Sequence, residues 1–181
     1  NQLLTLARHE PGDSPEHTMA AVDMNEIVKN TSLTLVNDAL RKNIDLGFEP
    51  SAQPAWVMGD SLSLIDLLTN LLDNAIRYTH DYGRVTARVN LTDAGVIVNV
   101  EDNGPGIAPA DRERVFERFY RVLGSNETGS GLGLAIVKEI ARLHQADITV
   151  DDAPDGRGTL FSICFARIAA PVEGKLNETE M

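Results

Sequence analysis

Residues 83–102 read GRVTARVNLTDAGVIVNVED, and this stretch distinguishes between the possible mixed α and β folds. Residues 83–91 and 95–102 each alternate apolar and polar side chains, and only residues 92–94 separate the two runs. Two alternating runs around a short turn predict an antiparallel hairpin. Parallel strands need helical crossovers between them instead, so the hairpin favours the α+β class.

Further regular elements are expected on both sides of the hairpin. An apolar stripe at helical spacing predicts a helix over 62–78, LSLIDLLTNLLDNAIRY, with Asp60 or Ser61 as its N-cap. Similar patterns predict helices at 25–43, 109–119 and 131–144 and strands at 19–25, 44–49, 54–59, 146–153 and 158–166. This order predicts an α+β two-layer sandwich, in which three helices cover one face of a mixed, roughly five-stranded sheet.

The two ends of the chain differ from its centre. Pro11, Gly12 and Pro15 interrupt the opening NQLLTLARHE, so residues 1–18 are expected to be the end of an upstream helix and a linker. Residues 19–168 would form the folded domain, and residues 169–181 a flexible tail.

The composition restricts the classes of function. The chain has 181 residues and a formal net charge of −11, which argues against nucleic-acid binding through phosphate neutralisation. Any site for a polyanion would therefore need local cations or a metal. The single cysteine, Cys164, excludes an internal disulfide and is expected in the core, and no apolar run is long enough to cross a bilayer.

A glycine-rich stretch, TGSGLGL at 128–134, precedes the expected helix at 131–144. It does not match a dinucleotide fingerprint, whose third glycine would fall at Leu134, or a P-loop, whose lysine would fall at Ser130. The protein-kinase motifs are also missing. Two interpretations remain from the residues alone: a helix N-terminus that attracts anions, or an ordinary surface loop.

Polar residues on the helix at 62–78 also have two interpretations. Asn70, Asn74, Arg77 and Tyr78 lie near one another, away from the apolar stripe. They are either solvated surface groups or a site in which Asn74 binds Mg²⁺ and Arg77 meets phosphate. Similarly, Asp102 is either the start of a turn or an acceptor for the exocyclic amino group of adenine.

Taken together, four stretches resemble motifs of one known family. They are TNLLDNAIRYT at 69–79, DNGPGI at 102–107, VFERFYR at 115–121 and GSGLGLAIVKEI at 129–140. In order and spacing they are similar to the N, G1, F and G2 boxes of the ATP-binding catalytic domain of bacterial two-component sensor histidine kinases. The resemblance covers residues 20–168. It implies that the domain binds Mg-ATP and donates the γ-phosphate to a histidine of a separate dimerisation domain.

The resemblance also implies a role for individual residues. Asn74 would bind Mg²⁺, Asp102 would bind the adenine amino group, and Phe116 and Phe119 would anchor an ATP lid at 117–130. The implied ATP-binding residues are Asn70, Asn74, Arg77, Tyr78, Asp102, Gly104, Gly106, Ile107, Phe119, Arg121, Gly129, Ser130, Gly131, Leu132, Gly133, Leu134 and Thr159. Arg112 and Arg114 are expected to be solvated, and Arg121 to meet the phosphates.

One position separates this sequence from related ATPases. Topoisomerase, mismatch-repair and chaperone ATPases have a glutamate as general base one turn before the Mg²⁺ asparagine, where this chain has Asn70. An amide is no base at neutral pH, so slow hydrolysis and transfer to another nucleophile are expected. The alternatives left open are an ATPase of that superfamily, a serine protein kinase, and a non-catalytic ATP-binding module.

The phosphoacceptor and partners follow from the same resemblance. None of the histidines, His9, His17, His80 and His144, lies in a phosphoacceptor pattern, so all four are expected to be ordinary surface or helix-end residues. Residues 1–18 would be the end of the dimerisation hairpin. The implied partners are that hairpin and a response regulator. This chain would be a monomeric cytoplasmic domain, and the full-length protein a homodimer in the bacterial inner membrane.

Overall fold

A computed structural model describes residues 18–121 and 130–171 of the chain. The expectations for the upstream helix at 1–17, for Gly129 and the rest of 122–129, and for the tail at 172–181 lie outside the described residues. Within the described ranges, no helix combines the length and the apolar character needed to cross a membrane.

The main sheet has five strands in the order β2-β4-β5-β7-β6. They are β2 (Asp45–Glu49), β4 (Arg84–Thr92), β5 (Gly95–Asp102), β7 (Thr159–Phe165) and β6 (Asp147–Asp152). β2 runs parallel to β4, and every other neighbouring pair is antiparallel. The predicted hairpin is confirmed as β4–β5, which closes with Thr92 opposite Gly95.

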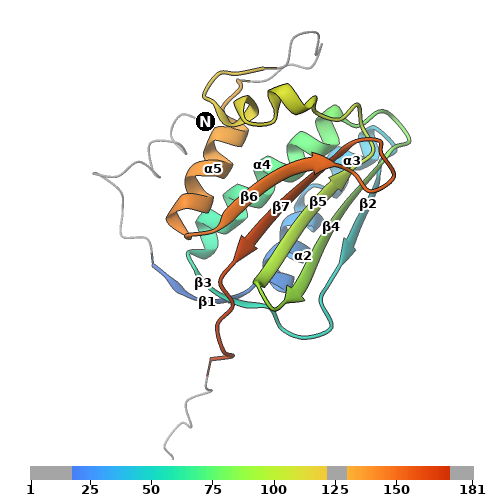
Figure 1. Ribbon diagram of the computed structural model, residues 1–181. Helices are drawn as coiled ribbons and strands as arrows, with labels where there is room; N and C mark the ends of the chain where they lie inside the picture. Colours follow the sequence, from blue (N-terminus) through green and yellow to red (C-terminus); the bar gives the residue numbers. More distant parts are fainter. Residues whose placement is uncertain (1–17, 122–129, 172–181) are drawn as a thin grey trace, which may run out of the picture.

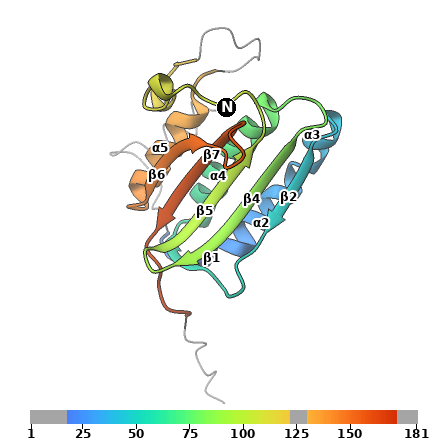
Figure 2. The same ribbon diagram turned by 45° about the vertical axis from the view of Figure 1, so that its right-hand side comes forward.

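Three helices cover one face of this sheet, as Figures 1 and 2 show. They are α2 (Met24–Thr34), α4 (Ser61–Tyr78) and α5 (Gly133–Leu143). The apolar stripe of α4, which includes Leu64, Leu68 and Leu71, packs in one core with alternate strand residues such as Val98 and Ile163. This two-layer arrangement confirms the predicted α+β sandwich.

A second, two-stranded sheet lies beside the main one. β1 (Ala20–Asp23) pairs antiparallel with β3 (Trp56–Gly59). The chain returns to this sheet after β7: Arg167 forms a bridge to Val57, and the Ile168 amide donates to the Trp56 carbonyl at 3.0 Å. The beginning and the end of the described chain therefore meet at β3.

Two predicted helices differ from the observed structure. The helix expected at 25–43 is interrupted at Leu35, after which the short α3 (Val36–Arg41) begins. The hydroxyls of Thr31 and Ser32 donate to carbonyls one turn back, at 2.8 Å each, and such bonds favour helix distortion.

The helix expected at 109–119 is instead two short 3₁₀ turns, η1 (Pro109–Asp111) and η2 (Arg114–Phe116). Only Val115 of these six residues is buried, so no continuous apolar stripe holds a longer helix against the core.

Cys164 is also placed differently from the expectation. Its neighbours Ile163 and Phe165 point into the core, so alternation along β7 puts Cys164 on the opposite face of the sheet. The thiol is half-buried there, and its Sγ lies 3.8 Å from the Ala94 carbonyl oxygen.

Candidate functional site

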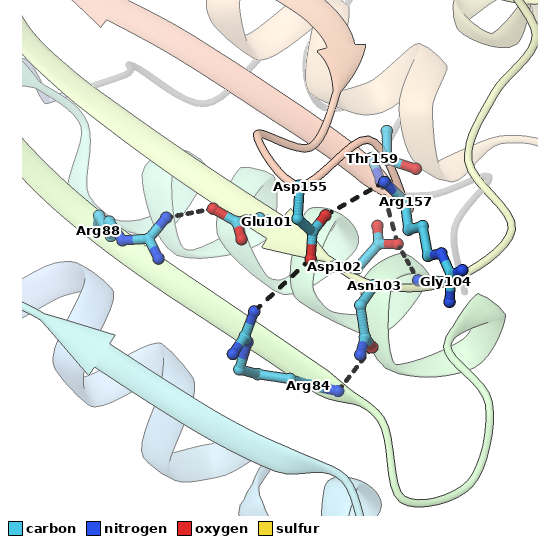
Figure 3. A network of polar contacts seen from close by, with 9 residues as sticks. All are labelled: Arg84, Arg88, Glu101, Asp102, Asn103, Gly104, Asp155, Arg157 and Thr159. Carbon is cyan, nitrogen blue, oxygen red and sulfur yellow. Dashed lines mark hydrogen bonds and ion pairs between the residues drawn. The ribbon is translucent and has the colours of Figure 1, made fainter.

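A buried carboxylate marks the end of β5. Asp102 is 5% exposed, and its Oδ1 accepts from the backbone amides of Gly104, at 2.9 Å, and Thr159, at 3.2 Å (Figure 3). Burial raises the pKa of this carboxyl above its usual range, hydrogen bonds from Gly104 and Thr159 oppose the rise, and the nearby charge of Glu101 adds to it. The two amides fix the orientation of the carboxylate.

Glycines let three chain segments meet around this carboxylate. Gly158 has φ +97°, and a Cβ atom on it would lie 1.9 Å from the Asp102 carbonyl oxygen. Gly106 has φ +77° and approaches the Gly158 carbonyl, whereas Gly104 packs against the Tyr78 carbonyl at the end of α4. Bare backbone therefore packs closely around Asp102, which side chains at these positions would prevent.

Gly158 lies at the site although it was not among the predicted residues. Thr159 was expected to lie near the site and does so through its backbone amide, but the glycine before it makes the close approach to Asp102 possible. The available signal was the pattern Gly-Arg-Gly-Thr at 156–159, in which two glycines directly precede a strand.

The asparagines of α4 face the N-terminus of α5. A Cβ atom on Gly133 would lie 3.1 Å from Asn70 Oδ1 and 3.5 Å from Asn74 Nδ2. Asn70 Nδ2 donates to the Asp66 carbonyl at 2.8 Å, which holds the amide in position. The structure thus brings together two motifs that lie about 60 residues apart in the sequence.

The other two polar residues at the end of α4 point to different neighbours. Arg77 forms an ion pair with Asp73, at 2.7 Å and one turn away on the same helix. Tyr78 ends α4, and its carbonyl lies beside Gly104. Because Asn74 is one turn before Tyr78, the Asp102 loop and the asparagine pair lie along the same stretch of α4.

Two residues on either side of 122–129 are joined at the backbone. The Phe119 amide donates to the Gly131 carbonyl at 2.8 Å, and Gly131, with φ +70°, leaves no room for a Cβ atom beside Phe119. Ser130 Oγ accepts from the Leu132 amide at 3.2 Å. Leu132 is buried, and Leu134 packs against the core.

The two phenylalanines expected to anchor the lid differ in their packing. Phe116 packs edge-on against Phe161, with ring centroids 6.3 Å apart. The Phe119 side chain is 66% exposed, and its backbone has φ +65°. Phe119 therefore holds this segment in place through its backbone hydrogen bond and not through packing of its ring.

Two further predicted residues differ in their burial. Arg121 is exposed at the end of the described segment, and Ile107 packs against the core.

Arg112 is less solvated than expected, whereas Arg114 is exposed, as expected. Arg112 forms ion pairs with Asp152, at 2.7 Å, and Asp151, and it donates to the Ile107 carbonyl at 3.2 Å. Arg114 lies over the ring of Tyr120, 4.4 Å from its centroid. Arg112 therefore ties the loop after Asp102 to the edge strand β6.

His144 is at a helix end, as expected, but it is buried and not on the surface. Its Nε2 accepts from the Asp60 amide at 3.1 Å, so the ring proton is on Nδ1, which lies 2.8 Å from the Ile140 carbonyl. Asp60 is the N-cap of α4. The ring thus joins the end of α5 to the beginning of α4.

The polar groups near α5 are amides and main-chain N–H groups, which are compatible with a magnesium-bound polyphosphate. Within 18–121 and 130–171, no three His, Cys, Asp or Glu side chains gather as metal ligands. Asn74 offers an amide beside the first turn of α5, where main-chain N–H groups point toward anions. Mg²⁺ commonly combines a few protein ligands with water and phosphate oxygens.

Comparison with known proteins assigns a family to this arrangement. The family described as "Histidine kinase-, DNA gyrase B-, and HSP90-like ATPase" matches residues 59–168. The swarming motility regulation sensor protein RssA of Serratia marcescens is 39% identical over 163 residues, which are 90% of this chain and 34% of that protein. The chain therefore spans about a third of the length of this relative.

Solved structures agree with the sequence comparison. The mycobacterial sensor histidine kinase MprB is 37% identical, with a TM-score of 0.72 over 83% of this chain and 98% of that one. Full-length ShkA in complex with AMPPNP is 30% identical, with a TM-score of 0.79 over 95% of this chain and 36% of that one. The chain therefore belongs to the family of histidine kinase-, DNA gyrase B- and HSP90-like ATPases, as a catalytic domain of the sensor histidine kinase type.

Proposed function

We propose that the chain binds Mg-ATP along the C-terminal half of α4 and donates its γ-phosphate to a histidine of a partner domain. The observation that carries this proposal is the buried Asp102 carboxylate, held by two backbone amides where glycine-bearing segments of the chain meet. The similarity to ShkA, which was solved in complex with AMPPNP, supports an adenine nucleotide as the ligand.

The order of the site residues along α4 supports one direction for the nucleotide. Asp102 would accept the adenine amino group, with Gly104, Gly106 and Gly158 against the ring. The phosphates would then extend back along α4 toward Asn74 and the N-terminus of α5, whose N–H groups and dipole favour anions. Bound at Asn74, Mg²⁺ would neutralise phosphate charge in this acidic chain.

The reaction class follows from the residue one turn before Asn74. Asn70 holds its amide against Gly133 and donates to the Asp66 carbonyl, so it supplies no general base for water. The chain would therefore position the nucleotide for an external nucleophile, and charge stabilisation would provide most of the rate. A hydrolysis rate like that of a dedicated ATPase, without any partner domain, would favour the alternative.

The partners proposed for the whole protein go beyond this chain. They are a dimerisation hairpin that carries the phosphoacceptor histidine and a response regulator that receives the phosphate. We place the chain on the cytoplasmic side of an inner-membrane sensor and expect it to be monomeric by itself.

Two measurements test the proposal. ADP and ATP with Mg²⁺ should raise the melting temperature of the chain, whereas GTP should not; equal stabilisation by both bases would exclude the role of Asp102. The chain should also transfer γ-phosphate in trans to a histidine-bearing hairpin domain of its own protein. The product should be acid-labile, and an acid-stable product would indicate serine or threonine instead.

A further inference from the structure

An ion-pair cluster lies on the face of the sheet opposite the helices, directly behind Asp102. Arg88 of β4 donates through Nη1 to Glu101 Oε2 and through Nε to Glu49 Oε2, the latter at 2.6 Å (Figure 3 shows the Glu101 contact). The side chain of Glu101 is only 11% exposed and that of Arg88 28%. This pair is thus much better shielded from solvent than an ordinary surface ion pair.

Glu101 and Asp102 are consecutive residues of β5, so their side chains leave opposite faces of the sheet. Two shielded carboxylates on adjacent residues repel each other, and the Glu101 charge is one of the causes that raise the pKa of Asp102. A cation paired with Glu101 reduces this repulsion. Arg88 itself has its pKa raised, first by the hydrogen bond to Glu101, which shows how closely the two charges interact.

The remaining charged groups near this end of the sheet are more exposed. Arg84 lies 4.0 Å from Asp155, both side chains are 54% exposed, and the Arg157 amide donates to Asp155. Exposed ion pairs of this kind interact only weakly, because water and salt screen their charges. Arg88 is therefore the cation whose position suits it to control the charge of Glu101.

We propose that Arg88 is a positioning residue for adenine recognition: by holding Glu101 as an ion pair on the outer face, it keeps Asp102 ionised and ready to accept the adenine amino group. This inference rests on the proposed function. Arg88 is on the far side of the sheet and would not touch the nucleotide, so its effect must pass through Glu101.

The test compares two nucleotides that differ only in the amino group. Binding of ATP and of purine riboside triphosphate, which lacks that group, is measured by calorimetry between about pH 6 and pH 8 for the whole chain and for Arg88→Met. Without Arg88, Asp102 would hold its proton to higher pH. ATP affinity should then fall more steeply with decreasing pH in Arg88→Met than in the unmodified chain, by about tenfold where Asp102 is fully protonated, since hydrogen bonds to charged groups contribute about 1.5–3 kcal/mol.

Controls separate this effect from simple loss of structure. Arg88→Lys keeps the cation and should retain most of the ATP affinity, and the double variant Arg88→Met with Glu101→Gln should restore it. Affinity for purine riboside triphosphate should not change in any variant. If Arg88→Met does not fold, the single variant Glu101→Gln must bind ATP at least as well as the unmodified chain at about pH 6.

Three results would overturn the inference: unchanged ATP binding in Arg88→Met at every pH, an equal loss for both nucleotides, or weaker ATP binding in Glu101→Gln. A different result would contradict the proposed function itself: the unmodified chain would then show no preference for ATP over purine riboside triphosphate.

Discussion

Asn70 and Gly133 touch across the two helices of the candidate site: a Cβ atom on Gly133 would lie 3.1 Å from Asn70 Oδ1. The first residue of α5 therefore approaches α4 through bare backbone. In the proposed complex, this contact sets the space between the asparagine amides and the N–H groups that would meet the phosphates.

Gly133→Ala should weaken nucleotide binding without reducing the stability of the fold. Alanine is favoured over glycine in a helix by about 1 kcal/mol, so the free energy of unfolding in urea should be unchanged or slightly higher. The added methyl group should displace the Asn70 amide and weaken Mg-ADP binding about tenfold in calorimetry. In an Asn70→Ala background, the same change should cost much less, and purely additive losses would contradict the contact.

Asn74→Ala tests the metal site. If Asn74 binds Mg²⁺, the variant should lose about tenfold in ADP affinity with Mg²⁺ present and very little with a chelator, because only metal-assisted binding depends on this amide. Calorimetry under both conditions measures the difference. Equal losses with and without metal would show that Asn74 supports the fold or touches the nucleotide directly.

Gly158→Ala should be strongly destabilising. The new Cβ atom would overlap the Asp102 carbonyl oxygen, and φ +97° is unfavourable for alanine, so a loss on the order of 3 kcal/mol or more is expected in urea unfolding. Gly156→Ala is the matched control, because Gly156 also has positive φ, +75°, but lies in open space. It should cost only about 1–2 kcal/mol. Similar losses in both variants would contradict the crowding at Gly158.

Asp102→Asn should weaken nucleotide binding without destabilising the protein at neutral pH. Because the folded state raises the pKa of Asp102, the folded protein binds this proton more tightly than the unfolded chain. The free energy of unfolding contributed by this group therefore falls as pH rises from about 4 through the raised pKa.

The free energy of unfolding of Asp102→Asn, minus that of the unmodified chain, should accordingly increase as the pH rises from about 4 through the raised pKa. Below about pH 4 the two free energies should be similar. Urea unfolding at several pH values measures this difference. ADP affinity should fall about 10- to 100-fold, as expected for a lost hydrogen bond to a charged group. If Asp102→Asn were less stable than the unmodified chain at pH 7, the upward direction of the Asp102 pKa shift would be contradicted.

His144→Ala should destabilise the domain by about 2–4 kcal/mol in urea unfolding, because it creates a cavity and leaves the Asp60 amide without its acceptor. His80→Ala is the matched control, since His80 is exposed, and should change stability by less than about 0.5 kcal/mol. A loss below about 1 kcal/mol for His144→Ala would contradict the structural role.

Much of the fold was predictable because it depends on local periodicity. Alternation along 83–102 and the stripe on 62–78 reflect burial of one side of each element, which sequence shows directly. The break at Leu35 was not predictable in this way. It depends on whether Thr31 and Ser32 turn their hydroxyls back to the helix carbonyls, and the same residues also occur in unbroken helices.

The candidate site was predictable where the residues in contact belong to the same short motif. Asp102 and Gly104 lie two residues apart and contact each other. Gly158 was missed because the pairing of β5 with β7 brings it beside Asp102 from a distant part of the sequence. Arg88 was missed because its ion pair with Glu101 depends on the directions that the two side chains take across the hairpin. The predicted hairpin gives the approximate register of residues 83–91 and 95–102, but it does not say which charged side chains of the two strands form an ion pair.

The bond between His144 and Asp60 joins the two helices of the candidate site at the end far from Asn74 and Gly133. A tilt of α5 about this bond would therefore change the separation of the helices at the opposite end, beside Asn74. The 11 residues of α5 form a lever arm of about 16 Å. A tilt of about 4° would move Gly133 by about 1 Å, so a slight shift in β3, which leads directly into Asp60, is magnified where the phosphates would bind.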